Sequence, residues 1–366
     1  MARVKLEDVC ERGSSNLKQS DVVDKDGDYP IYGASGYIGN VDFYHQEQPY
    51  VAVVKDGAGI GRTTLHPAKS SVIGTMQYLL PKGNVLPEYL CYVVKYMHLE
   101  KYFTGATIPH IYFKDYKNEE FNLDSLDRQK EIVSTLNKIE KVIESRTKEL
   151  ELLDELIRAR FVELFGNPLD GTAKYPIHQV GEVANSVDPQ PSHRTPPVEE
   201  GGIPYVSIKD CDYKTGKIDF EGARKVSPKV LEEHMNRYTL HDGDFVVGKI
   251  GTIGNPVFVP ARNDYTLSAN VVLVQPNSEL VNPYFLKYSF ESDFVERQFA
   301  EAKNSTSQAA FGIQKVRTVE VMNPDLDVQR EFEIFVKQVN KSKVKVQKAL
   351  DETQKLFDSL MQQYFG

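Results

Sequence analysis

Two long segments of the chain place apolar residues at alternating steps of four and three. In the first segment these positions are Ile132, Leu136, Ile139, Ile143, Leu150, Leu153 and Ile157. In the second they are Phe332, Val336, Val339, Val346, Leu350 and Phe357. Arg146 interrupts the first seam, and Lys343 and Thr353 interrupt the second. The spacing is that of a heptad seam between paired helices, and neither segment contains a proline.

The two segments form an internal sequence repeat in which Leu126 corresponds to Leu326 and later positions match at the same offset. The matching pairs are Leu126 and Leu326, Asp127 and Asp327, Gln129 and Gln329, Glu131 and Glu331, Lys141 and Lys341, Lys148 and Lys348, Leu150 and Leu350, and Leu156 and Leu356. The match runs without a gap to Phe165-Gly166 and Phe365-Gly366. Two unrelated amphipathic helices would not need the same start, stop and register. We therefore predict two helices of roughly 58 Å that pair antiparallel.

The repeat divides the chain into a domain and a helix, used twice. The central runs of the two domains are alike, Val53 to Gly61 and Val246 to Gly254, and each domain finishes with a polar loop. Short β-rich runs punctuated by glycine, with a few helices, predict a mixed α/β fold for each domain. The predicted segments are 1–125 and 167–325 for the domains, and 126–166 and 326–366 for the helices.

Composition restricts the class of protein. Hydrophobic residues make up 40% and charged residues 26%, as in soluble globular proteins. The longest apolar runs are too short to cross a bilayer. Cys10, Cys91 and Cys211 form neither a zinc spacing nor a disulfide framework, which predicts a cytoplasmic location. The net charge of −8 counts against a generally basic nucleic-acid binder, although phosphate contacts need only local cations.

The order of domain, helix, domain and helix resembles the specificity subunit of type I restriction-modification systems over essentially the full chain. Ile31 to Gly39, Ile203 to Val206 and Gly251 to Gly254 are similar to recurring stretches of that family. The resemblance implies two target-recognition domains, each of which recognises one half of a split site in double-stranded DNA. It implies that the helices set the gap between the halves. It also implies two methyltransferase subunits, which use S-adenosylmethionine, and a motor-nuclease subunit as partners, with no membrane involved.

The two domains differ in length and sequence, so the bipartite target should be asymmetric. An antiparallel helix pair relates the domains by pseudo-two-fold symmetry, which places the half-sites about one turn, or 34 Å, apart on one face of the duplex. Inserting residues into the 126–166 helix should then lengthen the gap without changing either half-site, and an unaltered gap would contradict this model.

Catalytic motifs are missing from the chain. The strings nearest to an adenine methyltransferase motif, Asn282-Pro283-Tyr284 and Asp188-Pro189-Gln190, do not match it. There is no P-loop and no HExxH, and the eight histidines show no metal-ligand spacing. Gly57 to Gly61 lacks the full dinucleotide-binding pattern. We therefore predict a non-catalytic subunit with no cofactor or metal of its own.

Candidate DNA contacts lie in loops and in one aromatic hairpin. Glycine loops allow close approach to a phosphate, and Lys55, Arg62, Lys249 and Thr252 lie in or beside them. Donors and acceptors suited to base edges are Thr107, His110, Lys114, Ser305, Thr306, Gln308 and Lys315. Tyr32, Ser35 and Tyr37 are further candidates. Tight turns and solvated loops are the alternative interpretation. Replacing Lys249 with Ala should weaken binding to all sequences and lower its salt dependence.

Two questions stay open at the level of sequence. Leu152, Leu156 and Phe161 lie off the heptad seam, where they either meet a partner subunit or widen the seam into the domains. A non-catalytic coiled-coil scaffold with two ligand-binding domains is the alternative function, which the acidic charge favours. Sequence-specific duplex binding separates it from a DNA-recognition subunit. A fused restriction-modification enzyme is disfavoured by the missing methyltransferase motif.

Overall fold

The computed structural model describes residues 2–22, 25–105, 109–190, 192, 194–249, 253–304 and 311–366. The chain forms two compact units: unit 1 is Met1–Lys148 with Val346–Gly366, and unit 2 is Glu149–Lys345. Both unit boundaries fall in the middle of a long helix instead of at its end. Each half of a helix belongs to the unit whose hydrophobic core it completes.

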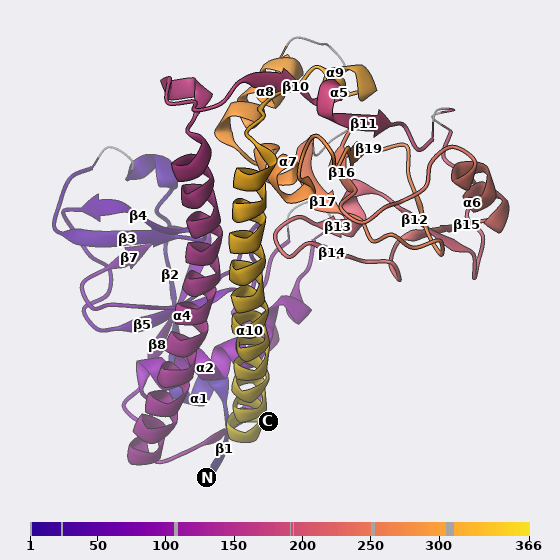
Figure 1. Cartoon of the computed structure of the whole chain (residues 1–366). Coiled ribbons are helices and arrows are strands. Elements are labelled where there is room, and N and C mark those ends of the chain that lie inside the picture. Colours follow the sequence, from indigo (N-terminus) through magenta and orange to yellow (C-terminus); the bar gives the residue numbers. More distant parts are fainter. Residues whose placement is uncertain are drawn as a thin grey trace. The chain divides into compact units, whose positions relative to one another are not determined.

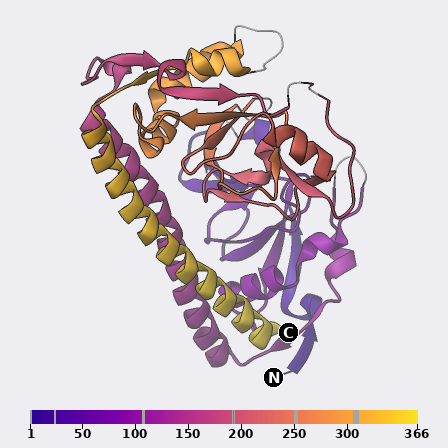
Figure 2. The same ribbon diagram turned by 45° about the vertical axis from the view of Figure 1, so that its right-hand side comes forward.

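The two long helices are α4 (Leu126–Phe165) and α10 (Leu326–Phe365), and both begin at the predicted residues. They run alongside each other in Figures 1 and 2. In unit 1, Leu136 near the start of α4 shares a core with Met361 and Phe365 at the end of α10. In unit 2, Phe165 at the end of α4 packs edge-to-face on Phe332, with ring centroids 5.6 Å apart. The helices therefore pair antiparallel, as the heptad pattern predicts.

Unit 1 is built from three small sheets and short helices. Its four-stranded sheet has the order β2-β8-β5-β6 and is antiparallel, and its three-stranded sheet has the order β4-β3-β7, with β3 and β7 parallel. The strands are β1 (Ala2–Lys5), β2 (Cys10–Ser14), β3 (Tyr29–Gly33), β4 (Gly36–Val41), β5 (Tyr50–Val54), β6 (Thr63–His66), β7 (Ser71–Val72), β8 (Met76–Pro81) and β9 (Glu120–Leu123). The helices, besides α4, are α1 (Leu6–Val9), η1 (Gln19–Asp21), α2 (Pro87–Tyr96), η2 (Leu99–Tyr102) and α3 (Phe113–Tyr116).

Unit 2 repeats this topology. The sheet β11-β19-β16-β17 matches β2-β8-β5-β6, β15-β12-β18 matches β4-β3-β7, and the pair β10-β20 matches β1-β9. The strands are β10 (Ile177–Gln179), β11 (Ala184–Val187), β12 (Ile203–Val206), β13 (Cys211–Asp212), β14 (Lys217–Ile218), β15 (Arg224–Val226), β16 (Phe245–Gly248), β17 (Gly254–Phe258), β18 (Thr266–Leu267), β19 (Val271–Pro276) and β20 (Glu320–Met322). The helices, besides α10, are η3 (Pro168–Asp170), α5 (Val180–Val183), η4 (Ile208–Asp210), α6 (Pro228–Met235), α7 (Pro283–Ser289), α8 (Asp293–Asn304) and α9 (Ile313–Arg317).

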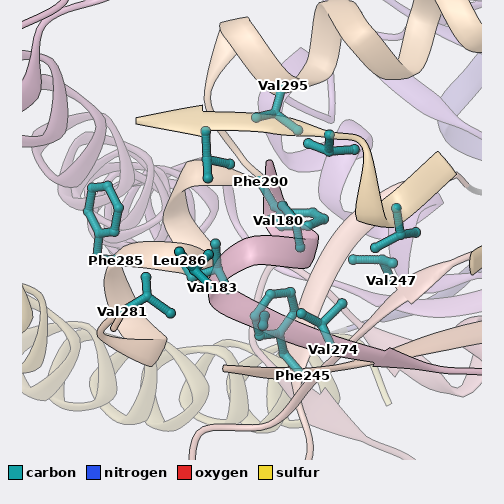
Figure 3. Packing of buried hydrophobic residues seen from close by; sticks show 14 of the residues in the cluster. Val180, Val183, Phe245, Val247, Val274, Val281, Phe285, Leu286, Phe290 and Val295 are labelled. Carbon is teal, nitrogen blue, oxygen red and sulfur yellow. The ribbon is translucent and has the colours of Figure 1, made fainter. Parts of the chain in front are cut away.

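The central strands are buried on both faces, which explains why they appear in the sequence as unbroken apolar runs. Successive side chains of β16 point to opposite faces, so Phe245 and Val247 enter the core beside the helices while Val246 enters a second core. Figure 3 shows the first core, where Phe245 and Val274 of the sheet lie among residues of α5 and α7. Burying each such side chain stabilises the fold by about 2 kcal/mol.

Candidate nucleic-acid interface

Three segments of unit 1 that are distant in sequence meet around the glycine loop between β5 and β6. Arg62 Nη1 donates to the carbonyl of Ala34, in the turn between β3 and β4, at 2.9 Å. His110 Nδ1 lies 2.6 Å from Asp56 Oδ1. Two backbone hydrogen bonds join residues 109–111 to residues 55–57. The structure thus brings together the aromatic hairpin, the glycine loop and the polar segment that precedes α3.

The glycine loop is a tight hairpin connection. Gly57, Gly59 and Gly61 have φ values of +84°, +85° and +83°, a region that favours glycine. A Cβ at Gly61 would lie 2.6 Å from the backbone nitrogen of Glu100, so a side chain there cannot be accommodated without a shift of the backbone. The chain that follows the loop enters β6 at Thr63. The loop is therefore a tight turn that also holds Arg62 at the surface.

The exposed side chains of this cluster combine cations with aromatic rings. Arg62 and Lys114 are exposed, and so is Ser35. Tyr37 is 61% exposed and meets the half-buried Tyr32 edge-to-face. Lys114 Nζ lies 5.3 Å from the ring centroid of Tyr112. Tyr112 was missed from the sequence, although its position beside a polar loop was a usable signal. Exposed cations of this kind can bind phosphates, and exposed aromatic rings can stack on bases.

Two other candidates in unit 1 are less available to a ligand. Lys55 is half-buried, with its Nζ 3.8 Å from Asp56 Oδ2. His110 is also half-buried and is held by the same carboxylate. Asp56 therefore orients both side chains and offsets part of the positive charge of Lys55.

The buried side chain of His66 packs against Tyr32 of the aromatic hairpin. The ring of His66 lies 4.3 Å from that of Tyr32 and stacks on Tyr50 at 5.4 Å. Burial lowers the pKa of His66 to about 4. The imidazole is therefore neutral at pH 7 and packs as an aromatic ring between Tyr32 and Tyr50. Its Nε2 lies 2.8 Å from the Thr64 hydroxyl, within hydrogen-bond distance.

Lys249 of unit 2 occupies the same backbone position as Lys55 of unit 1. The carbonyl of Lys249 accepts from Phe311 N–H, as the carbonyl of Lys55 accepts from Ile111 N–H. The side chain differs from the expectation of a surface cation, because it is only 6% exposed. Its Nζ lies 2.8 Å from Asp188 Oδ2. A buried ammonium needs such a partner, and Asp188, just after β11, supplies it.

Several predicted contacts cannot be placed. Thr107, Thr252, Ser305, Thr306 and Gln308 lie outside the described residues. Lys315 lies in α9 and is half-buried. The candidate contact residues that the structure describes therefore lie mostly in unit 1.

A domain of mixed sheets followed by a long helix, present twice in one chain, defines a two-domain protein with a paired-helix spacer. The chain matches the family model described as the type I restriction modification DNA specificity domain over residues 1–155 and 174–353. It therefore belongs to this family, in agreement with the resemblance found in the sequence.

Known proteins similar to this chain have the same description. The type I restriction enzyme MjaVIII specificity subunit of Methanocaldococcus jannaschii is 22% identical over 308 residues, which is 79% of this chain and 72% of that protein. The crystal structure of a type I restriction-modification S subunit from M. genitalium has a TM-score of 0.59 at 14% identity, covering 100% of this chain and 96% of that one. A chain from a structural study of complex assembly and conformational transition of the type I R-M system has a TM-score of 0.52 at 13% identity, covering 99% and 97%.

Two further findings apply to the residues that the structure describes. None of their helices is long and apolar enough to span a membrane. Nor do these residues contain a group of three or more His, Cys, Asp or Glu side chains placed to hold a metal ion.

Proposed function

We propose that this chain recognises a bipartite, asymmetric target in duplex DNA, with one half-site for each recognition domain, and positions methyltransferase and motor-nuclease subunits on it. One observation carries the proposal: in a chain of the DNA specificity family, the same domain topology and long helix occur twice. Two related recognition domains on paired helices suit a split target.

Differences between the two domains support an asymmetric target. Unit 2 inserts β13 and β14 between β12 and β15, where unit 1 has only the two-residue turn Ala34-Ser35. Helix α6 lies between β15 and β16, whereas residues 42–49, the matching connection of unit 1, are described throughout and contain no helix. These insertions change what the second domain can present to DNA, so the two half-sites should differ in sequence.

Local charge supports DNA contact despite the net charge of −8. Arg62 and Lys114 are exposed in the cluster formed by the aromatic hairpin, the glycine loop and the segment before α3. Within the described residues, neither side chain forms an ion pair with a carboxylate. Phosphate binding depends on such local cations more than on net charge. This surface favours DNA recognition over the alternative of a scaffold that binds other ligands.

The proposed role is non-catalytic, with adenine methylation on partner chains that bind S-adenosylmethionine. The absence of a methyltransferase motif in the sequence supports this assignment. Cys10, Cys91 and Cys211 are free thiols, which supports action in the cytoplasm.

The long helices carry candidate docking points for two copies of the methyltransferase subunit. Leu156 is 46% exposed and its repeat counterpart Leu356 is 52% exposed. Leu152 is exposed as well, whereas Phe161 is buried and packs on Phe165 and Phe332. These off-seam residues either contact a partner subunit or extend the packed seam into the domains. Phe161 does the second, because it is buried in the core of unit 2. An exposed leucine at one repeat position on both helices suits two identical partners.

An adenine-methylation map of the host genome tests the function. We expect deletion of the gene to remove methylation at one split, asymmetric motif, and complementation to restore it. The purified complex with its partner subunits should bind a duplex carrying that motif in preference to one with the half-sites scrambled. Unchanged methylation, together with equal binding of both duplexes, would contradict the proposal and favour the scaffold.

A further inference from the structure

A fully buried glutamine lies in the first turn of each long helix. Gln129 of α4 and Gln329 of α10 both have 0% exposure, although glutamine is mostly found at protein surfaces. They are equivalent positions of the repeat. A buried amide without partners is costly, so its hydrogen bonds show what it does.

In unit 1, Gln129 joins three pieces of backbone. Its Oε1 accepts from the N–H of Leu86 at 2.8 Å, and its Nε2 donates to the carbonyls of Asn84 at 3.0 Å and Asp124 at 2.9 Å. Leu86 is the N-cap residue of α2, and Asp124 precedes α4. One side chain therefore ties the start of the spacer helix to the strand–helix connection of its recognition domain.

In unit 2, Gln329 makes the counterparts of the bonds to Leu86 and Asp124, whereas its third bond is donated to the side-chain Oδ1 of Asn323 at 3.3 Å. Its Oε1 accepts from the N–H of Asn282 at 2.7 Å, and its Nε2 donates to the carbonyl of Pro324 at 2.6 Å. Asn282 caps α7, the counterpart of α2, through its own side chain. A buried glutamine thus forms a hydrogen-bonded joint between the long helix and its domain in both units, although the loops and insertions of the two domains differ.

Glutamine is the side chain that this joint requires. It supplies one acceptor and two donors at the end of a flexible stem, which matches the backbone groups present. Leucine has a similar volume but would leave those backbone groups without partners, and glutamate would lack the donors and bury a charge. Buried polar bonds of this kind fix one arrangement of the groups they join, where apolar packing tolerates several.

We propose that Gln129 and Gln329 are positioning residues that fix the direction in which each long helix leaves its recognition domain, and thereby the separation at which the two half-sites are accepted. The inference rests on the proposed function. Gln129 and Gln329, which occupy matching positions of the helix repeat, would then determine which separation of the half-sites is accepted. This role is distinct from recognition of the bases.

The test compares methylation rates on duplexes that differ only in spacer length. The purified complex with its methyltransferase subunits is given the two half-sites at the native separation or with one base pair added or removed. Wild type should prefer the native spacer. In Gln129→Leu and Gln329→Leu we expect the preference to fall on the order of tenfold, the change that one or two lost hydrogen bonds predict. Gln338→Leu, at an exposed position of α10, is the matched control.

The outcomes separate this inference from the function on which it rests. If the leucine variants lower the rates on all spacers equally, the glutamines serve stability alone and the inference is overturned. If wild type itself methylates no split motif, the proposed function fails. Should a leucine variant not assemble, Gln129→Asn keeps the amide but shortens its reach. The same ratio of rates then decides, with an unchanged ratio counting against the inference.

Discussion

At the scale of single residues, identical side chains at equivalent positions have different environments. Lys55 and Lys249 share a backbone position, yet one is half-buried near Asp56 and the other is buried against Asp188. A lysine in a domain interior must be paired, and removing one partner leaves the other charge without compensation. Residue type and loop context alone do not distinguish a phosphate contact from an internal ion pair.

The exposed Arg62 and the buried Lys249 should respond differently to mutation. Arg62→Ala should weaken binding to all duplexes and reduce the slope of log affinity against log salt by about one, because one phosphate contact is lost. Lys249→Ala should lower the free energy of unfolding by about 3 kcal/mol, because Asp188, whose side chain is only 16% exposed, loses its ion-pair partner. Salt-dependent binding and denaturant unfolding measure the two effects.

The double variant Lys249→Met with Asp188→Asn is the control, and it should recover most of the lost stability because neither charge remains. If Lys249→Ala lowered the salt slope and left unfolding unchanged, Lys249 would be a phosphate contact, as its loop position in the sequence first indicated.

At the scale of elements, the polar interruptions of the heptad seam are satisfied across the helix pair. Arg146 of α4 donates to the carbonyl of Ala349 and to the hydroxyl of Thr353 on α10. Lys343 of α10 pairs with Asp154 of α4 at 2.5 Å. Polar residues at seam positions specify register at a cost in stability. The interruptions therefore lie opposite suitable partners, so the seam remains continuous.

Aspartate at the exposed leucines tests the docking surface on these elements. Leu156→Asp and Leu356→Asp should each change the free energy of unfolding by no more than about 0.5 kcal/mol, because both positions are on the surface. Each should remove one methyltransferase subunit from the complex, and the double variant should remove both. Analytical ultracentrifugation of the assembled complex measures the stoichiometry.

Val344→Asp provides the matched control for this experiment. Val344 is exposed on α10, but its repeat counterpart is Glu144, so it is not part of a repeated apolar pair. The control should keep the full complement of partners. Full occupancy in the double leucine variant would exclude Leu156 and Leu356 as docking points.

At the scale of the whole molecule, one plan of domain and helix is used twice, and each long helix contributes to both compact units. Residues inserted in the middle of both helices therefore lengthen the helical segment between the two hydrophobic cores, and the residues of each core stay the same. An insertion of seven residues keeps the phase of the heptad seam.

A matched insertion of seven residues after Glu149 in α4 and after Lys348 in α10 tests the role of the helices as a spacer. It falls between the Arg146 and Lys343 contacts, so both pairs can still form. It lengthens each helix by about 10 Å, which corresponds to roughly three base pairs. We expect the methylated motif to keep both half-sites and gain a gap longer by that amount. A methylation map with an unchanged gap would contradict the spacer model.

The sequence by itself determined the two helices, their antiparallel pairing, the repeated domain and the family. These features depend on local periodicity and on similarity between two parts of one chain, both of which are visible without coordinates. The heptad spacing predicted helices that begin at Leu126 and Leu326, and unbroken apolar runs indicated the central strands β5 and β16.

Only the tertiary structure decided which side chains meet. Asp56 is 54 residues from His110, Asp188 is 61 from Lys249, and Gln129 is 43 from Leu86. No local pattern specifies such contacts, because they arise where strands and helices from distant segments pack around a shared core. Burial then changes the chemistry of the residue: Lys249 becomes an internal ion pair, and a repeated glutamine becomes the joint between each helix and its domain.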